Sequence, residues 1–390
     1  MPDATPWRER AAALAPLIQS CADESERGRR LAPAVVEAFH DAGLFRIQIP
    51  ERFGGAGLDP VEALSVYEEV AAADGSAGWN LAIGAGGGAF VAMLDDADAV
   101  EEIVGAPRAL LAGSVNPTAL RVVPEADGYR ISGRLRYASG VSQSSWLMAG
   151  GLVFDDDGAR PRMTQSGAPL IVGTFFPTRE ARVLDTWHVN GLAGTGSHDV
   201  EVGGVFVPSS RCFEFFSTKP RPFDPLAALP LFSRLGATIA GVGIGIARHA
   251  IEEFARLAGD KVPIASPSLL RDRAGVQIDV GRARGLVEGA RAHVTSTASE
   301  VFARVRAGAA PSVDDQVRLR LAYVSAAEGF ARAVDLVRNA AGMNAIALGS
   351  ALERCWRDAH AVTQHVAISP THFERLGRIT LGLDPGPGPI

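Results

Sequence analysis

The sequence contains little cysteine, almost no lysine and no long hydrophobic run. Three widely separated cysteines in 390 residues, with no CxxC pair, argue against a disulfide framework and against a zinc ribbon. Hydrophobic residues make up 47% of the chain, but no apolar stretch approaches the roughly 20 residues that a membrane span requires. We therefore expect a soluble protein that is not attached to a membrane.

The chain also lacks the signatures of nucleic-acid binding, of secretion and of metal binding. Its formal net charge is −6, and no cluster of basic residues is interleaved with aromatics, which argues against a nucleic-acid partner. The first residues show no basic segment followed by an apolar one, so we expect a cytoplasmic location. On a helix, His360 and His365 would lie about 140° apart, and no metal site is predicted.

Hydrophobic periodicity divides the chain into three parts. Apolar residues recur at three and four up to residue 108, the period changes to two over 109–220, and helical patterns return over 221–390. We predict an N-terminal helical domain, a middle β domain and a C-terminal helical bundle over these ranges. In the third part, the patterns predict four long helices, at about 230–258, 266–308, 313–340 and 350–367.

Two segments of the predicted β domain carry motifs. In the first, Asp185–Val200, Gly194 and Gly196 would let the backbone approach a ligand, while Thr195 and Ser197 offer hydroxyls to polar or phosphate oxygens. An ordinary β-turn is the alternative. The second segment, Gly133–Trp146, is rich in serine and is otherwise typical of a polar hairpin.

Together with the helical, β, helical order, these motifs resemble those of the acyl-CoA dehydrogenase superfamily, including its branch of two-component flavin-dependent monooxygenases. The resemblance implies a mainly α fold with a central β-barrel domain and a C-terminal four-helix bundle, assembled as a homotetramer or dimer. It also implies a flavin, FAD or FMN, between the β domain and the bundle. Six residues would contact that flavin: Asn116, Tyr137, Ser139, Thr195, Ser197 and Gly342.

The resemblance gives these residues different roles. Ser139, two residues after the aromatic Tyr137, matches a hydroxyl directed at flavin N5, where it would tune the ring. The amide of Asn116 would bond the edge of the ring, and Gly342 would approach the FAD diphosphate of a neighbouring subunit. A reduced flavin would come from a separate reductase, since no NAD(P)H-binding fingerprint is evident. The glycines Gly241–Gly245 lie in a helical pattern and predict close helix packing.

The segment Leu352–His365 also resembles the superfamily and bears on the reaction. Where a dehydrogenase usually carries its glutamate base, Val366 stands, while His365 matches a histidine typical of the monooxygenases. An imidazole there could take a phenolic proton or bond oxygen activated at the flavin. We therefore predict His365 and Ser139 as catalytic residues of a monooxygenase that acts on a small apolar or aromatic substrate.

One further departure weakens the monooxygenase prediction and, with the glutamate missing at Val366, keeps two alternatives open. Several monooxygenases carry a second histidine about eight residues after the tryptophan of Ser76–Trp79, but here Gly87 stands there, within the run Gly84–Gly88. Either a larger substrate would fill the space, or the machinery for oxygenation is incomplete. The alternatives are an acyl-CoA dehydrogenase with a displaced base and a catalytically silent flavin-binding subunit. This glycine run and Leu226–Phe232 also suggest an apolar substrate pocket.

Overall fold

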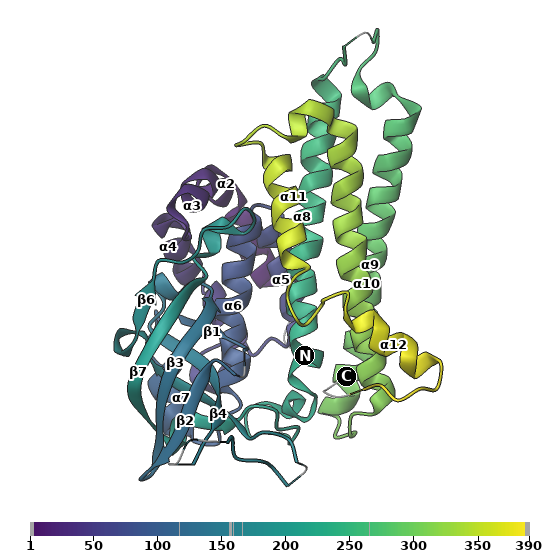
Figure 1. Cartoon of the computed structure of the whole chain (residues 1–390). Helices are drawn as coiled ribbons and strands as arrows, with labels where there is room; N and C mark the ends of the chain where they lie inside the picture. Colours follow the sequence, from purple (N-terminus) through teal and green to yellow (C-terminus); the bar gives the residue numbers. More distant parts are fainter. Residues whose placement is uncertain are drawn as a thin grey trace.

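The computed structural model describes residues 4–386 except positions 117, 156, 157, 159, 166 and 265. Helices flank a central run of strands, as the hydrophobic periodicity predicts (Figure 1). The helices of the first part are α1 (Thr5–Ala13), α2 (Ala15–Ser20), α3 (Ala22–Gly28), α4 (Pro33–Asp41), α5 (Pro60–Ala71), α6 (Gly75–Val91) and α7 (Ala97–Val104).

Local signals set where two of these helices begin. The Asp59 carboxylate accepts hydrogen bonds from Val61 N and Glu62 N, and Glu62 bonds back to Asp59 N, which forms a capping box at the start of α5. The Asp74 carboxylate accepts from Ala77 N and caps α6 with this single bond. These caps satisfy donors that the first helical turn leaves free.

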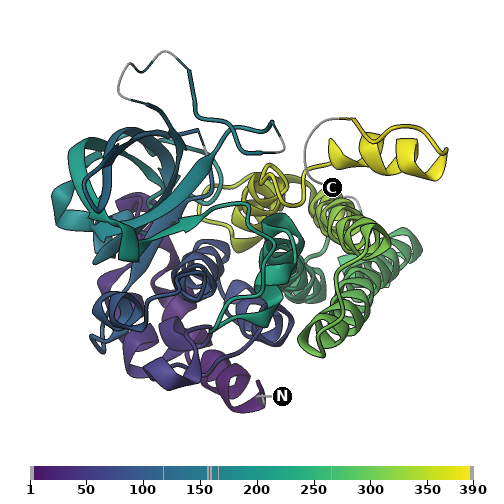
Figure 2. The ribbon, with the colours of Figure 1, turned by 90° about the horizontal axis from the view of Figure 1, so that it is seen from below.

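The middle part is one eight-stranded sheet, mostly antiparallel, that curls on itself (Figure 2). The strands are β1 (Leu111–Ser114), β2 (Leu120–Glu125), β3 (Gly128–Ala138), β4 (Trp146–Val153), β5 (Ile171–Pro177), β6 (Arg182–Leu184), β7 (His198–Pro208) and β8 (Cys212–Glu214). Within the described residues, β6 and β8 end the path of pairing and do not pair with each other. The predicted barrel is therefore a curled sheet whose pairing stays open.

The third part holds the long helices, which stand side by side in Figure 1. They are α8 (Leu231–Asp260), α9 (Ala274–Arg306), α10 (Val313–Ala341), α11 (Ala351–Val362) and the short α12 (His372–Thr380). Two of the predicted bounds are wrong. The second helix begins at Ala274, because the chain through Pro267 turns back and Leu270 N bonds to Lys261 O. The fourth helix ends at Val362, so His365 lies in a turn.

The predicted interpretation of Gly241–Gly245 as packing residues is confirmed. A Cβ on Gly245 would lie 2.4 Å from Glu68 O on α5, and a Cβ on Gly243 would lie 2.2 Å from the Phe330 ring on α10. Because α8 packs closely against both α5 and α10, no side chain larger than a hydrogen atom fits at positions 243 and 245. The glycines join the first and third parts into one core.

The space expected in the run Gly84–Gly88 is filled at Gly87 and Gly88. These glycines lie inside α6, where a Cβ on Gly87 would lie 2.7 Å from Leu111 Cβ and a Cβ on Gly88 would lie 2.7 Å from the Gln48 carbonyl. A helix tolerates glycine at a cost of about 1 kcal/mol per residue, and close packing offsets that cost here. A larger substrate therefore does not occupy the position of Gly87.

None of the described helices is both long and apolar enough to cross a membrane.

This packing makes a prediction about stability. Gly88→Ala should lower the free energy of unfolding by about 1–3 kcal/mol, because the new Cβ meets backbone atoms of Gln48 and Ile49 that cannot yield. Gly289→Ala in α9, where a Cβ meets nothing within 4 Å, is the matched control and should raise it by about 0.5–1 kcal/mol. Urea unfolding followed by circular dichroism measures both; equal effects would contradict the packing argument.

Candidate active site

Three hydroxyls predicted from separate motifs meet in one buried cluster. Ser139, just after β3, lies with its Oγ 2.7 Å from Ser197 Oγ, and Ser197 Oγ lies 2.6 Å from Thr195 Oγ1. The indole Nε1 of Trp79, on α6, donates to Ser139 Oγ at 3.0 Å. We call Ser139, Thr195 and Ser197 the hydroxyl cluster. It joins the β domain to a helix of the first part.

The loop that carries two of these hydroxyls is wedged between helices. A Cβ on Gly191 would lie 2.4 Å from Arg357 O on α11, and one on Gly194 would lie 3.0 Å from Ser76 Cβ on α6. Gly196, in the left-handed region at φ +56°, lies against the Arg29 carbonyl. The glycines that were expected to admit a ligand thus admit neighbouring segments of the chain itself.

The predicted aromatic residue Tyr137 lies at the edge of the cluster. Its backbone is left-handed, at φ +63°, where β3 shifts register against β7, and its side chain is 62% exposed. The ring meets Trp187 edge to face, with centroids 6.2 Å apart. A strained backbone that keeps a large aromatic ring exposed beside buried hydroxyls suits a site for a flat aromatic ligand.

Asn116 follows β1 and is partly buried. Its amide oxygen accepts from Thr118 N at 3.1 Å and from Thr118 Oγ1 at 3.0 Å, which closes a local turn. The predicted bond from the amide of Asn116 to a flavin edge would therefore fall to its Nδ2 group, which can donate.

His365 also contacts Trp79. The two rings meet edge to face at 5.6 Å, and His365 Nδ1 accepts from Ala367 N at 3.2 Å. Burial lowers the pKa of His365 from 6.5 to about 4, so the ring is neutral at pH 7. Because Nδ1 is an acceptor, the proton of the neutral ring sits on Nε2. His365 is a hydrogen-bond donor at neutral pH, and the expected ionisation near pH 7 does not apply.

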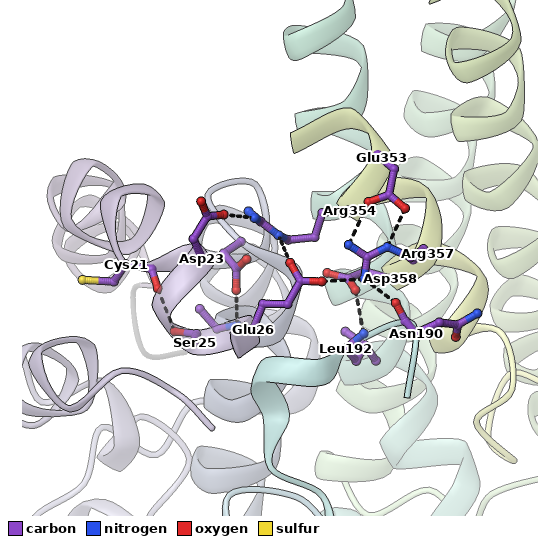
Figure 3. A network of polar contacts seen from close by, with 12 residues as sticks. Cys21, Asp23, Ser25, Glu26, Asn190, Leu192, Glu353, Arg354, Arg357 and Asp358 are labelled. Carbon is purple, nitrogen blue, oxygen red and sulfur yellow. Dashed lines mark hydrogen bonds and ion pairs between the residues drawn. The ribbon is translucent and has the colours of Figure 1, made fainter. Parts of the chain in front are cut away.

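An ion-pair network holds α11 against α3 near this loop (Figure 3). Arg354 and Arg357 of α11 both bind Glu26, with N–O distances of 2.8 and 2.7 Å, and Arg357 also donates to the Asn190 carbonyl. Asp358 does not join these pairs but accepts from Leu192 N at 2.6 Å. Burial and the nearby Asp74 carboxylate raise the pKa of Asp358 to about 7. These contacts hold α11 against the start of the hydroxyl-bearing loop, at Asn190 and Leu192.

The remaining predicted residues lie elsewhere. Gly342 ends α10 with φ +59°, and Lys261 Nζ donates to the Ala341 carbonyl beside it at 2.8 Å. In the chain, α11, a helix of 12 residues and about 18 Å, stands between Gly342 and His365. His360 pairs with Asp335, and within the described ranges no three His, Cys, Asp or Glu side chains are placed to hold a metal.

Two adjoining cavities lie between α6, the start of α8 and the loops before α5 and α8. One, of about 20 Å³, is lined by Gly86, Phe90 and Leu231 among others. The other, of about 120 Å³, includes Leu226 but also the charged Arg234. The segments expected to form an apolar pocket do lie together, and a polar group shares their space.

Sequence reasoning missed two residues of this site. Trp79 contacts both Ser139 and His365, and Asp358 holds the backbone of the hydroxyl-bearing loop. Both stand in motifs that the sequence offered, Ser76–Trp79 and the Arg-Asp-Ala run at 357–359. Their partners are 60 and 166 residues away in the sequence, so neither motif by itself indicates the contact.

Two family models match the chain. The model described as the acyl-CoA dehydrogenase N-terminal domain matches residues 8–99, and the one described as its C-terminal domain matches residues 237–370. They cover the helical parts on either side of the sheet.

Curated relatives and solved structures match nearly the whole chain. Indole-3-acetate monooxygenase of Pseudomonas putida is 32% identical over 94% of this chain and 91% of its own. FADH(2)-dependent resorcinol hydroxylase, oxygenase component, of Rhizobium sp. is 28% identical over 96% and 94%. The crystal structure of the HsaA monooxygenase from M. tuberculosis superposes with a TM-score of 0.88 at 27% identity, covering 99% of both chains.

The environment of His365 makes a prediction about its titration. The pKa of His365 in the folded chain lies below 6.5, so the unfolded chain binds a proton on this ring at a higher pH than the folded chain does. The stability of the fold is therefore unaffected by this ring above pH 6.5 and decreases as the pH falls from 6.5 towards 4. NMR of 15N-histidine-labelled protein, with His365→Gln for assignment, should show a midpoint below pH 5 and a proton on Nε2. A midpoint near 6.5 or a proton on Nδ1 would refute this assignment.

Proposed function

The chain belongs to the acyl-CoA dehydrogenase superfamily, in its branch of flavin-dependent monooxygenases, and we propose that it hydroxylates a small aromatic or apolar substrate with reduced flavin from a separate reductase. The chain is a flavin-dependent oxidoreductase. In the proposed reaction, O₂ and the two electrons and protons of reduced flavin convert a substrate C–H to C–OH, with water and oxidised flavin as the other products.

The observation that carries the proposal is the pair His365 and Val366. Val366 stands where a dehydrogenase needs a carboxylate base and is 46% exposed, whereas His365 faces Trp79 as a neutral donor. A neutral imidazole whose protonated form has a pKa of about 4 is a poor base for a carbon acid, but its N–H group can donate to oxygen. The site thus suits oxygen transfer better than proton abstraction from a thioester.

The hydroxyl cluster and its aromatic edge fit a flavin ring. Hydroxyls can donate to and accept from the polar edge of the ring, and Tyr137 with Trp187 offers aromatic surface beside them. In the proposed site, Ser139 lies at N5, Thr195 and Ser197 support it, and Asn116 bonds the pyrimidine edge. The flavin, when bound, supplies the electrons that activate O₂.

The protein's own groups orient Ser139 and His365 and exclude water from the site. Trp79 holds Ser139 through its indole N–H and packs against His365, so one rigid ring fixes both groups. His365 would donate from Nε2 to the reacting oxygen or to a phenolic substrate. Burial of the cluster excludes water, which would otherwise compete for these bonds.

Reduced FAD is the flavin that we propose. One relative is named as FADH(2)-dependent and as an oxygenase component, which also supports a reductase partner. FAD has a diphosphate, the group that the turn at Gly342 would approach. We place the enzyme in the cytoplasm, where its free cysteines Cys21, Cys212 and Cys355 would stay reduced.

We propose a homotetramer in which the turn at Gly342, at the C-terminal end of α10, serves a neighbouring subunit. Exposed apolar side chains surround the turn: Val262, Ile264, Met343, Ile346 and Leu348. We call this set the bundle-end patch. Leu348 is 89% exposed and Ile264 fully exposed, which is costly in a monomer.

An anaerobic titration with FAD and FMN, each oxidised and reduced, tests the function. We expect the protein to bind reduced FAD more tightly than the other three forms and, when O₂ is admitted, to hydroxylate a phenol or indole from a substrate panel. Tight binding of oxidised FAD that an acyl-CoA bleaches without added reductant would favour a dehydrogenase instead. Turnover by the pure protein would eliminate the silent-subunit alternative.

The variant His365→Ala belongs in the same experiment. Product formation should fall about 100-fold while the dissociation constant of the flavin changes little, because His365 acts on the reacting oxygen. His365→Gln keeps an N–H donor and should retain part of the activity. Equal hydroxylation by wild type and His365→Ala would remove His365 from the mechanism.

Sedimentation velocity tests the assembly. The double variant Ile264→Glu/Leu348→Glu should shift the protein from tetramer to a smaller species, because two charges would be buried at the contact. Val313→Glu, at the opposite end of α10, removes an exposed apolar residue outside the patch and should leave the assembly intact. An unchanged assembly in the double variant would place the interface elsewhere.

A further inference from the structure

The proton positions in the hydroxyl cluster follow from its contacts. Thr195 Oγ1 lies 2.8 Å from the Leu192 carbonyl, which can only accept, so Thr195 must donate its single proton there. The contact of 2.6 Å between Ser197 and Thr195 therefore requires Ser197 to donate. Ser197 has then used its proton, and the contact of 2.7 Å between Ser139 and Ser197 requires Ser139 to donate. All three hydroxyl protons point towards the Leu192 carbonyl.

These proton positions leave Ser139 able to accept a hydrogen bond from a ligand but not to donate one. Its proton goes to Ser197, and one of its two lone pairs accepts from the indole N–H of Trp79, which cannot act as an acceptor. A single lone pair remains for a ligand. Any group that meets Ser139 Oγ must therefore bring its own hydrogen.

The anchor of the chain of hydroxyls is held firmly. Leu192 is buried and has φ +54° and ψ +33°, a left-handed conformation that costs an L-residue about 1–2 kcal/mol. Its N–H donates to Asp358 at 2.6 Å, and its carbonyl also accepts from Trp187 Nε1 at 3.1 Å. Because the N–H of Leu192 is bonded to the buried Asp358 and its carbonyl is also bonded to Trp187, the carbonyl cannot turn away and release Thr195.

We propose that this directed hydroxyl chain, anchored at the Leu192 carbonyl, makes Ser139 a hydrogen-bond acceptor that selects the reduced flavin. Reduced flavin carries a hydrogen on N5, whereas N5 of oxidised flavin is a bare acceptor that would face the lone pair of Ser139. The inference rests on the proposed function for the placement of N5 at Ser139. It adds a reason why the site would reject its own product, oxidised flavin, and accept a fresh reduced one.

The test compares the dissociation constants of oxidised and reduced FAD in variants of the chain. Thr195→Val removes the proton that fixes the direction, so Ser197 can donate to Ser139 and Ser139 can donate outward. We expect the dissociation constant of oxidised FAD divided by that of reduced FAD to fall about tenfold. The reason is that Ser139, which only accepts in the wild type, could then donate a hydrogen bond to N5 of the oxidised flavin. For a two-electron couple, this corresponds to lowering the potential of the bound flavin by about 30 mV.

Matched variants separate direction from structure. Thr195→Ser keeps the hydroxyl and should keep the wild-type ratio. Thr174→Val is the control, because Thr174 is a buried threonine of β5 that also donates to a backbone carbonyl, that of Ala149, and should not change the ratio. If Thr195→Val does not fold, Ser197→Ala interrupts the chain at its middle and should lower the ratio in the same way.

The outcomes distinguish this inference from the proposed function. A wild-type preference for reduced FAD that Thr195→Val and Ser197→Ala both leave unchanged would overturn the directed chain and leave the function standing. Loss of the preference in Thr195→Ser or Thr174→Val as well would also overturn it, because a general disturbance would then be the cause. Binding of neither redox form by the wild type would overturn the proposed function and this inference together.

Discussion

The fold converges on the hydrogen bond between Asp358 and Leu192 N, which fixes the loop Asn190–Ser197 between three helices. The glycines at 191 and 194 bring this loop into contact with α11 and α6, and a Cβ would not fit at Gly191 and would be tightly packed at Gly194. A left-handed Leu192 turns the chain so that Thr195 and Ser197 face Ser139. Because the loop comes from the β domain and its supports come from the other two parts, the cluster exists only when all three are packed.

The chemistry depends on which groups are charged. The arginines of α11 are neutralised by Glu26 and Glu353, and His365 is kept neutral by burial. Between Trp79 and the hydroxyl cluster, the site therefore presents dipoles and N–H or O–H groups rather than ions. Such fixed dipoles can stabilise developing charge without the desolvation cost of a buried ion. This agrees with oxygen transfer, whereas a carbon acid requires the base that Val366 does not provide.

How much the sequence predicted depends on the range of each interaction. Periodicity predicted the helical, β, helical order, because its signal lies within a few residues. The motifs that resemble the superfamily pointed to Ser139, Thr195 and Ser197, which the structure brings together. Burial and long-range contacts carry no such signal. The neutral state of His365 results from its burial, and Gly87 and Gly88 look like open space in the sequence until Leu111 and the backbone of Gln48 are seen against them. The placement of the six residues Asn116, Tyr137, Ser139, Thr195, Ser197 and Gly342 at a flavin stays a prediction, as does the catalytic role of His365.

The tight packing of α6 at its glycines determines where the Trp79 ring lies in the site. Trp79 is near the start of this helix and Gly84–Gly88 form its second half, so the glycines decide how closely the helix lies on β1 and on the loop at Gln48. A helix transmits such a constraint along its axis because each residue advances by a fixed 1.5 Å. Side chains at 87 or 88 would push α6 outward and carry the Trp79 ring away from both Ser139 and His365. The glycine run therefore lowers the helix stability of one end of α6, and the close packing that it allows fixes the position of the Trp79 ring at the other end.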